Sequence, residues 1–376
     1  AQSKLSEDRL LFYKANVEHV FNHCQLSNQY ISRLFDRHKE QLNDTIIPDV
    51  LALKASNHIR LYQYQEAADA YHLIISQYGN ALDSANIAAY ENVRQLWQTV
   101  SAVKPQRIRK PHDVNIAAYR NQFNHLMTPV RCGQITDEFI FDTGANLSTI
   151  SEIYAKKMAL TVYESNVQVK SSTNISVQTK LAVADSLYVG DVLFENVVFL
   201  VVPDEQISFP SVNYYIHGII GFPVIYQMDE IHLSQNGTIF VPEQSQDKPL
   251  RNMYIEMLHL VAQLQSGADS LLFMMDTGAR TSDLSAQYYG KHKDVVEKEG
   301  VLQHVKRGGA GGVEETTVYQ LKNFPYTIGS KSGVLPEISV NTTLYSEHYD
   351  GALGQDVLLQ FNKMILNFQY MYVDFE

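Results

Sequence analysis

The sequence of 376 residues has little cysteine, a single tryptophan and no long hydrophobic run. Two cysteines, Cys24 and Cys132, are too few for a disulfide framework, so we expect two free buried thiols. No apolar stretch approaches the ~18 to 20 residues that a membrane-spanning helix needs. The composition therefore excludes a small disulfide-stapled scaffold and predicts no membrane span.

Positive charge is also scarce, with 30 Lys and Arg against 41 Asp and Glu and a net charge of −11. The basic cluster at 107–110 is too short for a nucleic-acid-binding patch, so no nucleic-acid partner is expected. Phosphate-binding, zinc-protease and serine-nucleophile motifs are absent from the sequence. His19, His23 and Cys24 have ligand-like spacing, but such histidines commonly share an ordinary helix face. We predict no metal site and no cofactor.

What the sequence does contain is one short motif twice. Asp142-Thr143-Gly144-Ala145 follows the apolar run Phe139–Phe141, and Asp276-Thr277-Gly278-Ala279 follows the apolar run Leu272–Met275. A single Asp-Thr-Gly can be an ordinary turn after a strand. Two copies, each with an apolar strand before it and an alanine after it, indicate a duplicated structure.

The surrounding sequence repeats with the motif. Gly218-Ile219-Ile220-Gly221 begins 76 residues after Asp142, and Gly351-Ala352-Leu353-Gly354 begins 75 residues after Asp276. Beyond these glycines the copies stay in step, with Val224-Ile225 matching Val357-Leu358, Gln227-Met228 matching Gln360-Phe361, Ile231 matching Met364, and Leu233 matching Leu366. A repeat of this length predicts two related lobes rather than a solenoid.

These residues resemble the aspartic peptidases, in which a strand leads into Asp-Thr-Gly and an apolar-apolar-Gly segment later threads beneath it. The alanines after the motifs and the glycine-rich segment 308–312 are more similar to the retropepsin branch than to the pepsin branch. Retropepsins are usually homodimers that contribute one aspartate from each chain. Because this chain carries both copies, the resemblance implies a fused, pseudo-symmetric form covering about residues 126 to 376.

The resemblance implies an aspartic endopeptidase that needs no cofactor and acts on a peptide or protein substrate. Two adjacent carboxylates share one proton, so one can activate water while the other protonates the carbonyl oxygen. The implied catalytic residues are Asp142 and Asp276, supported by Thr143, Gly144, Ala145, Thr277, Gly278 and Ala279. The alanines lack the hydroxyl that pepsin-like relatives often have there, which favours a less acidic working pH.

Two segments are candidates for flaps that close over an extended substrate. The first is the tip of a predicted hairpin, at Ser172 and Thr173, within the alternating stretch 167–177. The second is the segment with Gly308, Gly309, Gly311 and Gly312, which is too rich in glycine for the interior of an element. A plain mobile turn is the alternative interpretation of the second segment.

The first third of the chain lies outside the resemblance and has helical periodicity. Paired helices with small alanines and tyrosines weakly resemble tetratricopeptide repeats. The expected fold is multi-domain α + β: a helical domain (1–104), a proline-bearing linker (105–125), and a bilobal all-β peptidase fold with retropepsin-like lobes at 126–244 and 245–376.

The sequence leaves two alternatives open. The helical domain could dock a protein partner, or it could be an inhibitory pro-region. The β unit could instead be a catalytically silent binding scaffold, because fold alone does not fix function. The first residue is Ala1, as in a processed exported protein or a trimmed chain, and we expect export to the bacterial periplasm or the extracellular space.

Overall fold

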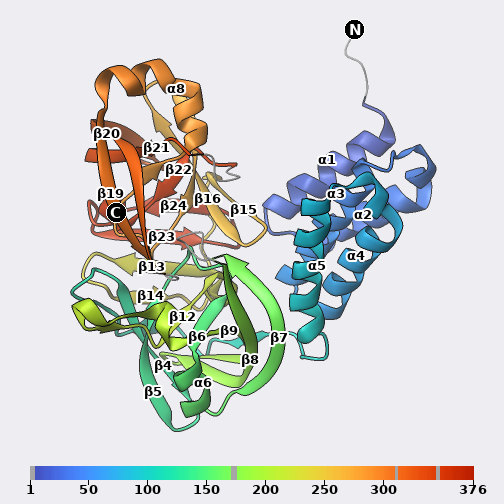
Figure 1. The fold of residues 1–376 in the computed structure, drawn as a ribbon, viewed down its shortest axis with the longest axis horizontal. Helices are drawn as coiled ribbons and strands as arrows, with labels where there is room; N and C mark the ends of the chain where they lie inside the picture. The colour runs from blue at the N-terminus through green and yellow to red at the C-terminus, as the bar shows by residue number, and fades with distance from the viewer. Residues whose placement is uncertain (1–4, 171–175, 310–311, 344–347) are drawn as a thin grey trace.

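The computed structural model describes residues 5–170, 176–309, 312–343 and 348–376. Its N-terminal part is helical and lies beside a β-rich body, as Figure 1 shows. The flap candidates Ser172, Thr173 and Gly311 lie outside the described residues. No helix in the described part of the chain is long and apolar enough to cross a membrane.

The helical part consists of consecutive helices joined by short turns. These are α1 (Glu7–Val20), α2 (Cys24–His38), α3 (Ile46–Arg60), α4 (Tyr64–Tyr78) and α5 (Ser84–Thr99), with single 3₁₀ turns at Lys39–Gln41 and Gly79–Ala81. Alanines, Tyr71 and Ile74 form the buried stripe of α4. The side chain of Asp83 accepts a hydrogen bond from Asn86 N and caps α5. Helical periodicity therefore accounts for this part of the fold, and a side-chain cap starts α5.

The first β unit is a nine-stranded sheet in which six strands close into a ring. The ring runs β4, β5, β12, β6, β9, β8 and back to β4. Its strands are β4 (Leu126–Cys132), β5 (Ile135–Phe141), β6 (Ser148–Ser151), β8 (Ser176–Val189), β9 (Val192–Val202) and β12 (Gly218–Ile220). The strands outside the ring are β1 (Arg107–Arg109), β3 (Tyr119–Arg120), β7 (Thr161–Lys170) and the small pair β10 (Ser208–Phe209) and β11 (Tyr214–Tyr215). The helices of this unit are α6 (Glu152–Lys157) and α7 (Phe222–Ile225), with 3₁₀ turns at Asp204–Ile207, Pro210–Val212 and Tyr226–Met228.

The second β unit is an eight-stranded sheet whose pairings also close on themselves. The ring runs β16, β17, β22, β18, β21, β20 and back to β16. Its strands are β16 (His259–Ser266), β17 (Asp269–Met275), β18 (Asp283–Leu284), β20 (Gly312–Ile328), β21 (Lys331–Asn341) and β22 (Gly351–Leu353). Outside it lie β15 (Met253–Glu256), α8 (Ala286–Glu299), β19 (Val301–Gly309) and α9 (Gln355–Leu358).

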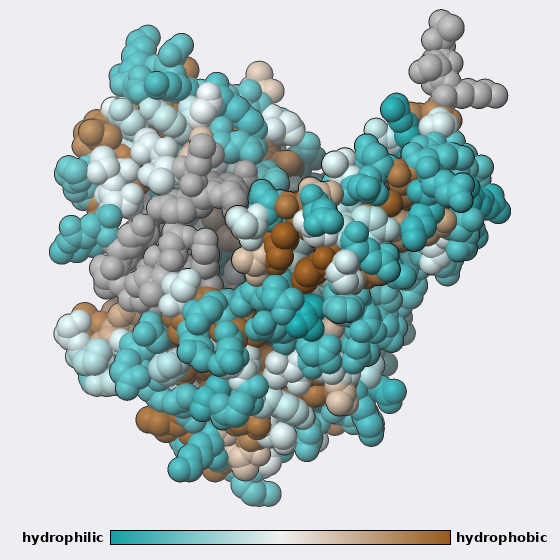
Figure 2. Space-filling model, turned by 45° about the vertical axis from the view of Figure 1, so that its right-hand side comes forward, coloured by the Kyte–Doolittle hydropathy of each residue, from teal (hydrophilic) through white to brown (hydrophobic). Residues whose placement is uncertain are grey.

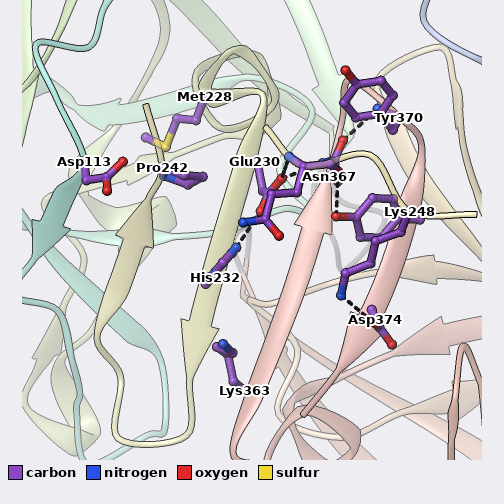
Figure 3. A network of polar contacts seen from close by, with 12 residues as sticks. Asp113, Met228, Glu230, His232, Pro242, Lys248, Lys363, Asn367, Tyr370 and Asp374 are labelled. Carbon is purple, nitrogen blue, oxygen red and sulfur yellow. Dashed lines mark hydrogen bonds and ion pairs between the residues drawn. The ribbon is translucent and has the colours of Figure 1, made fainter. Parts of the chain in front are cut away.

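A five-stranded sheet joins the two units, in the order β2, β14, β13, β23, β24. Its strands are β2 (Val114–Ile116), β13 (Glu230–Ser234), β14 (Ile239–Val241), β23 (Lys363–Asn367) and β24 (Tyr372–Phe375). Figure 3 shows Glu230 and His232 on one central strand facing Asn367 on the other. The buried Glu230 carboxylate accepts from Asn367 Nδ2 at 2.6 Å and contacts His232 Nε2 at 2.6 Å. Burial opposes ionisation of Glu230, but these bonds outweigh it and hold its pKa below the ordinary value.

Two sequence expectations are wrong in detail. Residues 105–125 are not a free linker, because β1 pairs with β9, β2 with β14 and β3 with β4. Gly308, Gly309 and Gly312 belong to strands, in which Gly309 pairs with Gly312. In both cases strand pairing overrides the local signal of proline or glycine.

The helical part is packed against the β body. The rings of Tyr62 and Tyr226 stack with 6.1 Å between centroids and 4° between planes. Tyr62 Oη donates to Pro223 O at 2.7 Å, and Gln106 Nε2 donates to the same carbonyl at 3.1 Å. Both tyrosines are buried. This contact reaches α7, which directly follows the glycine segment of the first unit.

The outer surface of the helices is mostly hydrophilic in the view of Figure 2, with hydrophobic residues at their junction with the β units. Cys24 is buried in the helices, and Cys132 is half-buried in β4; neither forms a disulfide.

Candidate active site

Each Asp-Thr-Gly-Ala motif begins where a buried strand ends. Asp142 follows β5, and its N–H donates to Ile220 O of the parallel strand β12 at 3.0 Å. Asp276 follows β17, and its N–H donates to Leu353 O of the parallel strand β22 at 3.0 Å. The apolar runs before the motifs and the apolar residues between the glycines thus form paired strands that fix both loops.

The two threonines join the loops across the interface between the units. Thr143 Oγ1 donates to Met275 O at 2.7 Å, and Thr277 Oγ1 donates to Phe141 O at 3.0 Å. In return, Thr143 N donates to Thr277 Oγ1 at 3.0 Å and Thr277 N donates to Thr143 Oγ1 at 3.1 Å. Both side chains are buried, so each of these groups would be costly to leave unpaired. The reciprocal bonds hold the two loops in one arrangement.

Backbone N–H groups hold the two carboxylates close together. Gly144 N donates to Asp142 Oδ1 at 2.8 Å, and Ala279 N donates to Asp276 Oδ1 at 2.9 Å. Gly278 N lies 2.9 Å from Asp276 Oδ1 and 3.1 Å from Asp142 Oδ1. Because one N–H reaches both side chains, Asp142 and Asp276 form a single group of two carboxyls.

Both motif glycines are required by this close approach. A Cβ atom at Gly144 would lie 2.5 Å from Cγ of Asp276, which is shorter than any real contact. A Cβ atom at Gly278 would likewise overlap the Asp142 carboxyl group. Each glycine therefore makes room for the aspartate of the other unit, which explains why the motif needs glycine at its third position.

The environment favours the protonated form of both carboxyls. Burial, followed by the nearby charge of Asp142, raises the pKa of Asp276 to about 8. Burial also raises the pKa of Asp142, against the lowering effect of its backbone donors. Both aspartates are half-buried, and the loss of hydration at their carboxyls is the main cause of the raised pKa values. Two carboxyls this close cannot both ionise easily, so the pair retains a proton near neutral pH.

Sequence reasoning missed two serines that support the loops. Ser148 Oγ accepts from Gly221 N at 3.0 Å, and Ser282 Oγ accepts from Gly354 N at 2.9 Å. Each serine lies six residues after its aspartate, so the repeat itself carried a signal for them. These bonds tie the glycine segments to the strands that leave the aspartate loops.

A further support has no counterpart among the described residues of the first unit. Gln355 Nε2 donates to Thr277 O at 2.8 Å, and Arg120 Nη1 donates to Gln355 Oε1. The matching position of the first unit is Phe222, which has no polar side chain. Nothing in the repeat could have indicated this contact, because it depends on Arg120 from the stretch expected to be a linker.

The other sequence candidates belong to elements other than the two aspartate loops. Gly308 and Gly309 end β19 and Gly312 begins β20, in a hairpin of the second unit. His19 Nδ1 lies 2.8 Å from Asn57 Oδ1, whereas His23 Nδ1 contacts Glu18 Oε2 at 2.7 Å. The two histidines therefore have separate partners and do not form a common site.

Comparison with known proteins bears on the first β unit. Residues 128–224 match a family model described as aspartyl protease. A search of curated proteins finds no match to the chain. The matched segment includes Asp142, the glycine segment that pairs with β5, and the strands between them, and it supports an aspartic peptidase family for this part of the chain.

Proposed function

We propose that the protein is an aspartic endopeptidase in which Asp142 and Asp276 together activate water against a peptide bond. The observation that carries the proposal is the Gly278 N–H, which lies within hydrogen-bond distance of both carboxylates. The raised pKa values of both groups support a shared proton. A buried pair that keeps one proton has both an acid and a base ready at the same pH.

The proposed reaction needs no covalent intermediate. Water loses a proton to the ionised carboxylate as its oxygen bonds to the carbonyl carbon, and the protonated carboxyl gives its proton to the carbonyl oxygen. The tetrahedral intermediate then breaks its C–N bond as the carboxyl that took the water proton gives it to the leaving nitrogen, and the other carboxylate takes a proton from one of the two hydroxyls. The products are a carboxylic acid and an amine, and the dyad again holds one proton. The proton belongs to the pair rather than to either residue.

We further propose that residues 126–244 and 245–376 are duplicated, pseudo-symmetric lobes. The two closed rings have the same pairing order, and in each the glycine-bearing strand lies parallel to the strand before the aspartate. In the joining sheet, Ile231 pairs with Leu366 and Leu233 pairs with Met364. These are crosswise pairs of residues that the repeat makes equivalent, as expected around a two-fold axis.

The hairpins β7–β8 and β19–β20 occupy matching places at the ends of the two sheets. We propose that they are the flaps, and that an extended substrate pairs its backbone partly with them. A catalytically silent scaffold is the competing interpretation. The retention of both carboxyls, both close-approach glycines and both threonines favours the enzyme.

Digestion of a peptide library by the purified full-length chain tests the proposal. We expect internal peptide bonds to be cleaved, and specific activity to stay constant on dilution to well below micromolar, because one chain supplies both aspartates. The measurement is product mass together with initial rate at each dilution. A steep fall of specific activity on dilution would instead indicate sites built between chains.

A further inference from the structure

The hairpin β7–β8 has an arm that extends beyond the first ring. We define the arm as residues 167–170 of β7 and 176–179 of β8, which pair with each other. The pairing of β8 with β9 begins only at Lys180, opposite Val201. The arm therefore lacks the neighbouring strand that supports the rest of β8, and β7 is the outermost strand at this end of the sheet.

A β-bulge separates the arm from the base of the hairpin. Tyr163 pairs with Leu181 and Val167 pairs with Thr179, so residues 164–166 face only Lys180 on the other strand. Bulges bend a strand and locally disrupt its ladder. The bulged residues also line a cavity of about 580 Å³, which residues of α5 line as well. The base of the arm therefore has both an irregular backbone and free space beside it.

Asn92 of α5 contacts the arm just above this bulge. Its Nδ2 donates to Gln168 O at 2.8 Å, and its Oδ1 accepts from Gln168 N at 2.9 Å. One amide side chain thus satisfies both backbone groups of a single residue on the outermost strand, as a paired strand would. Figure 1 shows α5 beside β7, which agrees with this contact. The other side-chain bonds described for Val167, Gln168, Gln178 and Thr179 stay within the hairpin.

We propose that Asn92 is a positioning residue that sets the resting position of the first flap, so that the helical domain is coupled to substrate binding. The inference rests on the proposed peptidase function and on the arm being part of a flap. Asn92 acts through Gln168 and takes no part in the chemistry at the dyad. Loss of its two bonds frees the arm to pivot at the bulge, which disfavours the arrangement that pairs with substrate.

The test compares Asn92→Ala with the unmodified full-length chain. We expect amide hydrogen exchange at Gln168 to rise about tenfold, because two hydrogen bonds of modest net strength are lost. We expect KM to rise about three- to tenfold, an effect on the order of one hydrogen bond, with kcat changing less. The pH profile of kcat/KM should stay unchanged, since it reports the dyad.

Asn86→Ala is the matched control, because Asn86 lies on the same helix and its side chain contacts Asp83 instead of the hairpin. Amide hydrogen exchange at Gln168 is also measured with Asn92→Ala combined with Asp142→Asn, so that the result does not depend on peptidase activity. Unchanged amide hydrogen exchange at Gln168 in Asn92→Ala would contradict the proposal that Asn92 holds the arm in place. Faster exchange with unchanged KM would overturn the coupling to substrate binding. Absence of cleavage by the unmodified chain would instead overturn the proposed function and leave the exchange result valid.

Discussion

If the proposed mechanism holds, replacement of Asp142 or Asp276 by asparagine lowers kcat by about a thousandfold or more. Asparagine has nearly the same shape as aspartate but cannot take up or release the proton. Asp142→Asn removes one half of a pair that shares a hydrogen-bond donor at Gly278, and Asp276→Asn removes the other half. Because the pair works as a unit, the double variant should be no less active than either single variant. The kcat of the two single variants and of the double variant is measured by steady-state cleavage of one peptide taken from the library.

The Asp→Asn variants should keep the fold, because burial already disfavours the charge that each substitution removes. Circular dichroism and thermal unfolding establish that the loss is one of chemistry. Asp191→Asn is a suitable control, since Asp191 is exposed in the turn between β8 and β9. Substantial activity in either active-site variant would eliminate the two-carboxylate mechanism.

Removal of the helices is the second change with a large expected effect. A fragment of residues 105–376 keeps β1 and β2 but loses Tyr62, which covers Tyr226 in the intact chain. We expect the fragment to melt about 10 °C or more below the full chain, because several kcal/mol of packing are lost. Its activity should fall too, since Tyr226 follows α7, where Phe222 N donates to Ala145 O in the first aspartate loop. Thermal unfolding and cleavage rate are measured on both proteins.

Point variants at Tyr62 measure the effect of the Tyr62–Tyr226 contact apart from the other effects of removing the helices. Tyr62→Ala should cost about 3 to 5 kcal/mol, as is usual for loss of a buried aromatic ring. Tyr62→Phe should cost about 1 kcal/mol, because Pro223 O keeps its bond from Gln106. A fragment as stable as the full chain would show that the helices are an independent domain. A fragment of much higher activity would show that they are an inhibitory pro-region.

The repeat made much of the β body predictable. Two Asp-Thr-Gly-Ala motifs and two glycine segments at nearly equal spacing indicated duplicated lobes, and the described contacts place both motifs at one site. This sequence signal was strong because each part of the motif has its own physical role. The apolar strand fixes the loop, and the glycine makes room for the aspartate of the other unit. The serines at 148 and 282 followed the same spacing and could have been found from it.

Contacts between segments far apart in sequence could not be predicted. Pro105 and Pro111 indicated a linker, yet strand pairing with β9 and β14 orders the residues between and after them. Arg120 reaches Gln355, and Asn92 reaches Gln168, through tertiary packing that leaves no local pattern. The tetratricopeptide resemblance of the helices gained no support from the comparisons.

In the proposed mechanism Asp142 and Asp276 share one proton, and titration of ¹³C-labelled aspartate carboxyls in the intact protein measures that proton directly. The two variants with asparagine at these positions assign the signals. We expect one carboxyl of the pair to keep its proton until about pH 8, and this step to move to lower pH in Asp142→Asn because the neighbouring charge is gone. Two carboxyls that ionise independently near the ordinary aspartate pKa of about 3.9 would contradict it.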